Sequence, residues 1–344
     1  MAKAPCTEPI ENFFDIYDEI GRGQYAVVKR CKEKATGKEF AAKFVRKRRK
    51  GKDCRAEVWH EVEVLHATNS PHQHPQIITL YDVFETRSEI ILILELALGG
   101  DLHRHCVAYD TDEPASSRSE REVVFLLRQI LEGVKHLHER DFVHLDIKPN
   151  NILLMTEHSY PEIKIIDFGL ARQIKDGEQI CLIVGTPEYV VGKGKTTDSQ
   201  SLDVWRSGNS QGGGGGEGDV GGWRLTGLSP FAGEDKQETC YNVSLGALDF
   251  PEDYFKNISH TAQDFIKRIL QRDADDRPSV QECLNHPWLN TEELFQRSPI
   301  RKSRRSCGSE QKQRRKKLKK MQKQNGVADG SPIPIVNGVG GDSR

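Results

Sequence analysis

The first hundred residues alternate between apolar and polar positions in short runs. Runs rich in β-branched and aromatic residues, bounded by Gly, Thr-Gly or Thr-Arg-Ser, are typical of strands. The pattern predicts strands at residues 13–20, 25–35, 38–47, 78–86 and 89–96. One helix, over Arg55–Ala67 with Asp53 as its candidate N-cap, is expected to interrupt them.

Beyond Gly100 the apolar positions recur with the period of a helix. The clearest case follows Ser119, which forms a capping box with Glu122. Two later helices are expected to begin near Ser259 and Ser279. The chain is therefore expected to form an α+β fold, with a small β-rich lobe followed by a larger helical lobe.

These patterns set the expected domain boundaries. Residues 1–12 form an N-terminal extension, 13–97 the small lobe, 98–289 the large lobe and 290–344 a disordered tail. Within the large lobe, the segment 190–224 is aberrant because it contains five glycines in succession. Each glycine costs a helix about 1 kcal/mol relative to alanine, so the glycine-rich part at 206–224 is expected to be a flexible insertion.

Charge is distributed unevenly along the chain. Residues 297–323 contain 13 Lys and Arg and one acidic residue, whereas the whole chain has a net charge of −1. An acidic body favours basic peptide partners. The basic clusters within 301–323 are interpreted as a nuclear localisation signal that engages the nuclear import machinery; a non-specific polybasic tail or a calmodulin-binding helix are the alternatives. Nucleic acid is not expected as the main ligand, because no aromatic residues interleave the charges.

Composition also bears on the compartment. The eight cysteines are at least 23 residues apart, which indicates reduced thiols rather than a disulfide framework. No signal peptide or membrane span is expected from the apolar runs. We therefore expect the protein in the nucleus and cytoplasm.

A glycine-containing turn joins the first two predicted strands. The segment at 20–28, IGRGQYAVV, would let backbone N–H groups approach phosphate oxygens. Such hairpins also occur as plain turns, and Ala26 occupies the place of a third glycine. Lys43 lies in an apolar strand, where its charge is costly unless Glu61 and nucleotide phosphates neutralise it. The alternative is an edge-strand lysine directed at solvent.

Two later motifs decide between these alternatives. Residues 143–154 read VHLDIKPNNILL, and residues 164–169 read KIIDFG. They resemble the catalytic loop and the metal-binding Asp-Phe-Gly motif of eukaryotic protein kinases, and they follow the glycine turn, Lys43 and Glu61 in the order of that family. The resemblance implies the two-lobed protein kinase fold, ATP and Mg²⁺ as cofactors, and transfer of the γ-phosphate to Ser and Thr hydroxyls.

The resemblance also implies the catalytic roles. Lys43 would hold the α and β phosphates, and Glu61 would fix Lys43. Asp146 would accept or orient the proton of the substrate hydroxyl, and Lys148 would stabilise the transferring phosphate. Thr186 matches the position that supports Ser and Thr acceptors.

The metal and nucleotide sites are implied in the same way. Asn151 and Asp167 would bind Mg²⁺. Leu94 would be the gatekeeper, Glu95 and Ala97 the hinge residues that meet adenine, and Asp101 a contact to the ribose. The nucleotide cleft would be completed by Ile20, Gly21, Gly23, Ala26, Val28, Ala41 and Leu153.

Within the kinases, the chain resembles the death-associated protein kinase family and its DRAK subgroup over about residues 12–290. The features that carry this resemblance are RKRRKGK at 46–52, SEIILILELALGGDL at 88–102, HLDIKPNNILL at 144–154, GTPEY at 185–189 and SPFAGEDKQETCYN at 229–242. It implies apoptosis-related signalling and protein substrates, with myosin light chain as a candidate.

Two departures from the family concern regulation. Leu145 stands where many kinases have an arginine that binds an activation-loop phosphate. Between Phe168 and Gly185 there is no Ser, Thr or Tyr. Phosphorylation of that segment cannot be the switch, so any activity is expected to be intrinsic.

A third departure concerns integrity. After Tyr189 the chain reads VVGK instead of Ala-Pro-Glu, which removes the family's partner for a buried arginine matched here by Arg277. Asp203 matches the start of the family's central helix and would brace the catalytic loop, but the glycine-rich run replaces the rest of that helix. Either the coding sequence over 190–224 is misassembled, or the chain is a genuine variant that folds poorly or serves as a catalytically impaired scaffold.

Overall fold

The computed structural model describes residues 5–23, 25–107, 120–157, 161–174, 200, 203, 258–271 and 273–290. Apart from Gln200 and Asp203, the segment 190–224 lies outside these ranges. Thr186, the Ser119 cap and the basic tail also lie outside them.

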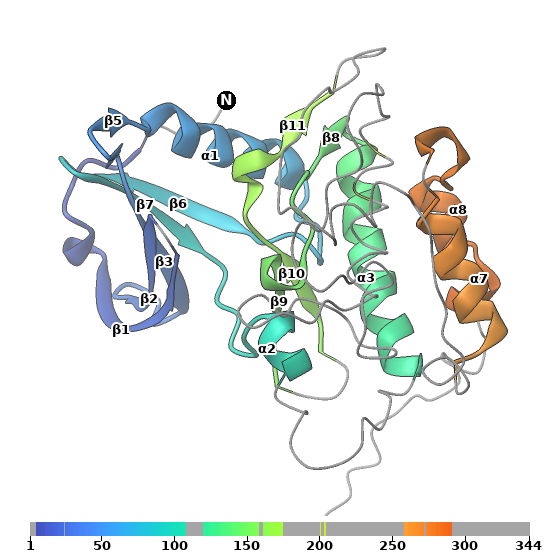
Figure 1. The fold of residues 1–344 in the computed structure, drawn as a ribbon. Helices are drawn as coiled ribbons and strands as arrows, with labels where there is room; N and C mark the ends of the chain where they lie inside the picture. The colour runs from blue at the N-terminus through green and yellow to red at the C-terminus, as the bar shows by residue number, and fades with distance from the viewer. Residues whose placement is uncertain are drawn as a thin grey trace, which may run out of the picture. The chain divides into compact units, whose positions relative to one another are not determined.

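The five predicted strands form one antiparallel sheet in the order β1-β2-β3-β7-β6. They span Phe14–Arg22 (β1), Ala26–Glu33 (β2), Glu39–Arg46 (β3), Leu80–Glu85 (β6) and Glu89–Leu94 (β7). Figure 1 shows this sheet in blue and cyan. Each strand lies within or close to its predicted run, because the alternation of apolar and polar positions matches the two faces of a sheet.

The N-terminal segment covers the free edge of β6. Cys6 pairs in parallel with Phe84, its N–H donating to Val83 O at 2.8 Å and its carbonyl accepting from Glu85 N at 2.8 Å. Ile10, in the short helix η1 (Ile10–Asn12), is buried among the side chains of the outer sheet face. Residues before the predicted lobe boundary therefore contribute to the lobe.

Helix α1 runs from Arg55 to Asn69, two residues longer than predicted. Its N-cap position is Cys54 rather than Asp53, and the Asp53 carboxylate accepts the N–H of Arg55 at 3.0 Å. Before the helix, the basic segment forms a hairpin of β4 (Arg48–Arg49) and β5 (Lys52–Asp53). Its two turn residues, Lys50 and Gly51, both have positive φ, as a tight two-residue hairpin turn requires.

The large lobe is built around α3 (Glu120–His138), which packs against β10 and α8. The other helices are α2 (Leu102–Val107), α7 (His260–Ile269) and α8 (Val280–Leu284), with the short helices η2 (Pro149–Asn151), η3 (Phe168–Leu170), η5 (Ala274–Asp276) and η6 (Pro287–Leu289). The short strands are β8 (Phe142–Val143), β9 (Ile152–Leu154), β10 (Ile163–Ile165) and β11 (Arg172–Gln173).

Both predicted helix starts in the last part of the lobe are confirmed, and both are capped. The Ser259 side chain accepts the N–H of Ala262 at the start of α7. Ser279 and Glu282 form a complete capping box at the start of α8. These caps pair backbone N–H groups that helices otherwise leave unsatisfied.

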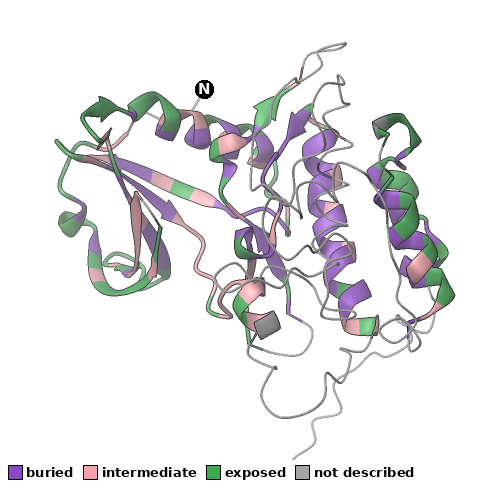
Figure 2. Cartoon of the chain, viewed as in Figure 1, coloured by how far each residue is buried: buried purple, intermediate pink, exposed green. Residues whose placement is uncertain are grey.

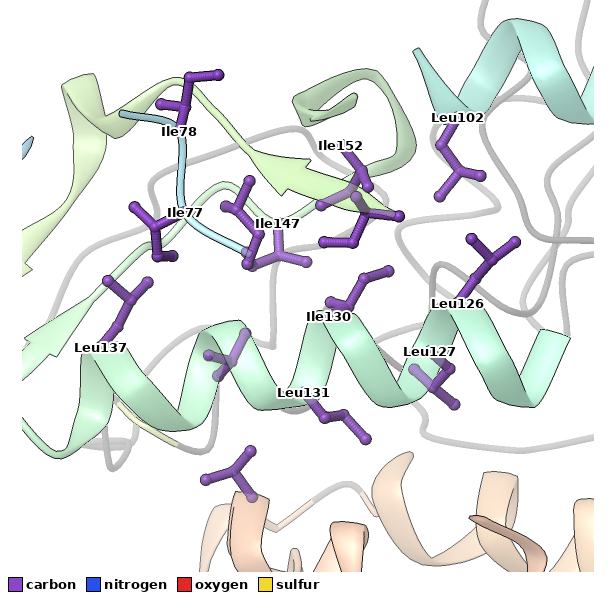
Figure 3. Close-up of a cluster of buried hydrophobic side chains, with 14 of the residues drawn as sticks. Ile77, Ile78, Leu102, Leu126, Leu127, Ile130, Leu131, Leu137, Ile147 and Ile152 are labelled. Atoms are coloured by element: carbon purple, nitrogen blue, oxygen red, sulfur yellow. The ribbon is translucent and has the colours of Figure 1, made fainter. Parts of the chain in front are cut away.

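The core of the large lobe lies along α3. Figure 3 shows side chains of the helix meeting those of the neighbouring strands and loops, and Figure 2 shows most of the helix as buried, with intermediate and exposed positions between. At Gly133 a Cβ would lie 2.6 Å from Cδ1 of the buried Ile165, so a larger residue there would force the core to shift. None of the described helices is both long and apolar enough to cross a membrane. Four cysteines in the described ranges are free thiols: Cys6, Cys31, Cys54 and Cys283.

Candidate active site

The glycine turn lies at the tip of the β1–β2 hairpin. Gly21 pairs with Val28, and the Gly23 N–H donates to Ala26 O at 2.9 Å. Ile20, on β1, is among the exposed large apolar side chains. The predicted loop residues are therefore brought together on β1 and β2, and β2 pairs with β3, the strand that carries Lys43.

Lys43 is held at the middle of the sheet by a carboxylate from helix α1. Its Nζ lies 2.6 Å from Glu61 Oε1, and both side chains are largely buried. Burial disfavours the ammonium form, but the carboxylates of Glu61 and Asp167 outweigh it and raise the pKa of Lys43 above its ordinary value. Lys43 is thus a charged side chain directed at an acidic partner, and the solvent-facing alternative is wrong.

The segment after β7 connects the two lobes. Leu94 ends the strand, and the Glu95 N–H donates to Thr79 O at 2.9 Å. The Glu95 carboxylate lies 2.8 Å from Nζ of Lys164 on β10. The segment that connects the lobes is therefore tied to the strand that leads into the Asp-Phe-Gly motif.

The far end of this segment is fixed to β9. Gly99 N–H donates to Leu154 O at 2.9 Å, and a Cβ on Gly99 would lie 2.4 Å from Thr156 O. Asp101 forms a backbone bridge with Leu153. Its carboxylate accepts the Arg104 N–H at 2.8 Å, so it caps α2 in addition to any ligand role.

Asp203 braces the catalytic loop from within. Its buried carboxylate accepts the backbone N–H groups of His144 at 2.7 Å and Leu145 at 2.9 Å. His138 Nε2 donates to the same carboxylate at 3.2 Å. Burial disfavours the charged carboxylate, but these hydrogen bonds lower its pKa below the ordinary value. Leu145 has a φ of 62°, a conformation unusual for a non-glycine residue, and the two adjacent hydrogen bonds help to hold it.

Asp146 is the centre of a small polar network. Lys148 Nζ lies 2.8 Å from Asp146 Oδ2. Asn151 donates from Nδ2 to both the Oδ2 and the carbonyl oxygen of Asp146, each at 2.9 Å. Two predicted site residues, Lys148 and Asn151, therefore converge on the carboxylate of a third, Asp146.

The Asp-Phe-Gly segment is packed against both the catalytic loop and helix α1. Asp167 has a left-handed backbone, with φ 65° and ψ 72°. Phe168 is fully buried and meets the His144 ring edge-on at a centroid distance of 4.9 Å. His60 Nε2, on α1, donates to Ala171 O at 2.7 Å. Helix α1 and the Asp-Phe-Gly segment are thus joined.

Some contributors were not predicted. His60 and His138 make these joining contacts, and Lys164 pairs with Glu95. Lys164 could have been predicted to need an acidic partner, because it is a lysine among apolar strand residues. The two histidines gave no such signal, because their partners are distant in sequence. Arg277 is buried and its Nε donates to Gln271 O at 2.8 Å.

Comparison with known proteins agrees with this geometry. Residues 14–289 match the family model described as "Protein kinase domain". The chain is 46% identical over 287 residues to serine/threonine-protein kinase 17A of Oryctolagus cuniculus, covering 82% of this chain and 68% of that protein.

Two further relatives carry the death-associated name. Death-associated protein kinase 2 of Mus musculus is 41% identical over 290 residues, covering 82% of this chain and 73% of the relative. Death-associated protein kinase dapk-1 of Caenorhabditis elegans is 38% identical over 287 residues, 82% of this chain and 19% of that protein. The chain belongs to the protein kinase family, and within it to the death-associated protein kinases and their DRAK subgroup.

Proposed function

We propose that this chain transfers the γ-phosphate of Mg-ATP to Ser and Thr hydroxyls of basic protein substrates, using the residues described above. The observation that carries the proposal is the 2.6 Å pair between Lys43 and Glu61, with the Asp167 carboxylate close enough to act on the same ammonium. Phosphoryl transfer depends mainly on positioning and charge neutralisation, which such an arrangement supplies.

The donor set fits a magnesium nucleotide. Asn151 directs its Nδ2 at Asp146, which leaves the amide oxygen Oδ1 for a cation. With the Asp167 carboxylate, this offers the hard oxygen ligands that Mg²⁺ prefers. Bound Mg²⁺ would neutralise phosphate charge. Lys43 would hold phosphate oxygens, and the hairpin of Gly21 and Gly23 would cover them.

Asp146 would receive the proton of the substrate hydroxyl. Lys148 and Asn151 both direct N–H groups at its Oδ2, and these contacts orient the carboxylate. Lys148 would then neutralise charge on the transferring phosphate. Thr186 retains its proposed role in acceptor choice.

The test is phosphate transfer from Mg-ATP to a basic peptide or to myosin light chain. Asp146→Asn should lower kcat by at least about 100-fold, the scale of a lost general base. Asp141→Asn is the matched control, because Asp141 is exposed nearby and asparagine tolerates its positive φ. Equal transfer by the wild-type chain and Asp146→Asn would contradict catalysis. If the wild-type chain bound nucleotide in that case, the result would favour the alternative of a catalytically impaired scaffold.

Substrate and compartment follow as further proposals. We infer that the acidic body accepts basic substrates, with myosin light chain as a candidate, and that the chain acts in apoptosis-related signalling. The clusters within 301–323 support nuclear import, with the protein divided between nucleus and cytoplasm. Replacing Arg304 and Arg305 together with the basic run at 314–317 by alanine should leave a fluorescently tagged chain in the cytoplasm; an unchanged distribution would contradict the import signal.

A further inference from the structure

The β4–β5 hairpin places one arginine between the glycine turn and helix α1. The Arg49 guanidinium lies over the Tyr25 ring, 4.7 Å from its centroid. Its NH1 lies 3.0 Å from Oε2 of Glu57 on α1. In addition, Arg46 N–H donates to Tyr25 O at 3.4 Å, so the end of β3 meets the turn at the same residue.

Helix geometry makes the Glu57 contact significant for the site. Glu57 and Glu61 are four residues apart and hence lie on the same face of α1. Glu61 pairs with Lys43 on β3, and Glu57 pairs with Arg49 on the hairpin. Ion pairs on successive turns therefore join α1 to strand β3 and to the β4–β5 hairpin.

The chemistry of the side chain suits this place. A guanidinium can stack on a ring with its face and pair with a carboxylate through its edge at the same time, which an ammonium cannot do as well. Arg49 is only about a quarter exposed, and its Nε is buried without a hydrogen-bond partner among the described residues. The ring and the carboxylate are thus the contacts that hold it.

We propose that Arg49 is a positioning residue that couples the glycine turn to helix α1. The turn closes over the phosphates through Tyr25, and the same guanidinium holds the helix that presents Glu61 to Lys43. The inference rests on the proposed function, since it concerns the nucleotide of that reaction. It also gives a phosphate-free means of holding α1 in a chain whose segment 168–185 contains no Ser, Thr or Tyr.

The first experiment measures binding of a non-hydrolysable Mg-ATP analogue by calorimetry, which needs no transfer activity. Arg49→Ala should weaken binding by about 3- to 10-fold, the scale of a cation–π contact with one ion pair. Arg48→Ala is the matched control: Arg48 is on the same strand and its described hydrogen bond is to Gly51 O. Tyr25→Phe should bind as the wild-type chain does, whereas Tyr25→Ala should resemble Arg49→Ala.

The second experiment measures whether a change at Tyr25 alters the stability of helix α1. Hydrogen exchange of the amides in 55–69 should become faster in Tyr25→Ala as well as in Arg49→Ala, and stay unchanged in Arg48→Ala. The double variant Tyr25→Ala with Arg49→Ala should bind within about 2-fold of either single variant. The effects of two coupled residues on binding do not add.

The outcomes separate the two proposals. Equal affinities of Arg49→Ala and Arg48→Ala, or unchanged exchange of α1 in Tyr25→Ala, would overturn the coupling while leaving the kinase proposal intact. A wild-type chain that binds no Mg-nucleotide would overturn both. Unfolding temperatures of all variants, measured beside the binding, identify a variant whose loss is a global loss of folding.

Discussion

Glu120, the first residue of α3, accepts two hydrogen bonds from Ser259, the N-cap of α7. The Ser259 N–H donates at 2.6 Å and its hydroxyl at 2.7 Å. Trp288 Nε1 donates to the same carboxylate at 3.0 Å. One side chain thus joins the N-terminal end of α3 to segments that follow the glycine-rich stretch in sequence.

Replacing Glu120 should destabilise the large lobe. Glu120→Gln removes charge from three hydrogen bonds, each of the charge-assisted kind, and should lower the free energy of unfolding by about 2 kcal/mol. Urea unfolding measures this. Glu63→Gln, the same change at an exposed position of α1, should stay within about 0.5 kcal/mol. Equal midpoints for the two variants would contradict the proposed link.

Asp203 should matter for turnover more than for nucleotide binding. Asp203→Asn turns one acceptor atom into a donor facing the N–H groups of His144 and Leu145, at a cost of about 1–3 kcal/mol. We expect kcat to fall at least about 10-fold, because the adjacent Asp146 loses its alignment. KM for ATP should change less than kcat, and steady-state kinetics at varied ATP separates the two. A variant with unchanged kcat would show that the brace is dispensable.

Gly99 should tolerate no side chain. In Gly99→Ala the new Cβ would meet the carbonyl oxygens of Thr156 at 2.4 Å and Leu154 at 2.7 Å, which are backbone atoms that cannot rotate away. We expect a loss of about 1–3 kcal/mol of stability and weaker nucleotide binding, because the connecting segment must shift. Leu98→Ala is the control, because Leu98 directly precedes Gly99 and its side chain is mostly exposed. Thermal unfolding of both variants, with and without Mg-ATP, tests this.

Acid should destabilise the protein through a pair of stacked histidines. The ring centroids of His74 and His136 lie 4.1 Å apart. Burial, and after it the charge of His136, lowers the pKa of His74 to about 4. Burial also lowers the pKa of His136 below its ordinary value. The unfolded chain therefore binds more protons than the folded chain between about pH 6.5 and 4, so stability falls as the pH falls through that window.

The charged groups around the pair are Arg140 and Lys164, which oppose protonation, and Glu139, which favours it. His74→Gln should lose less stability between pH 7 and 4.5 than the wild-type chain does. Unfolding temperatures across this range measure the difference. Parallel curves for the two proteins would show that the stacked pair does not titrate on unfolding.

Phosphatase treatment should leave the activity unchanged. The segment 168–185 offers no acceptor hydroxyl, and Leu145 cannot bind a phosphate. Transfer rates before and after treatment, with mass spectrometry to confirm removal of phosphate, provide the measurement. A loss of activity on treatment would place a required phosphate elsewhere in the chain.

The parts of the site that were predictable are polar residues in apolar surroundings. Lys43 in an apolar strand carries its own signal, since burying a charge without a partner is costly. The role of Asp146 followed from the resemblance of its motif to the kinase catalytic loop. The brace from Asp203 followed from the family resemblance. The contact of His60 with Ala171 O was not predictable, because the two residues are far apart in the sequence and only the tertiary fold brings them together.

The basic segment shows a different limit. A run of lysines and arginines resembles a solvated surface loop, and nothing in its charge distinguishes Arg49 from Arg48. The Lys50-Gly51 turn makes the run a hairpin and directs Arg48 and Arg49 differently. This turn is a local signal in the sequence, but the many charges around it drew attention away from it. Likewise Asp53 has a residue type typical of an N-cap, but the N-cap position of α1 is Cys54, although the helix begins at Arg55 as predicted.

The pairing of Cys6 with Phe84 has a consequence for shortened forms of this protein. A chain trimmed to begin at Phe14, where the family match starts, would leave Val83 O and Glu85 N without their bonds and uncover Ile10's site on the sheet. An open strand edge of this kind is a template for a strand from another molecule. We therefore expect residues 5–12 to keep the edge of β6 from pairing with a strand of another molecule.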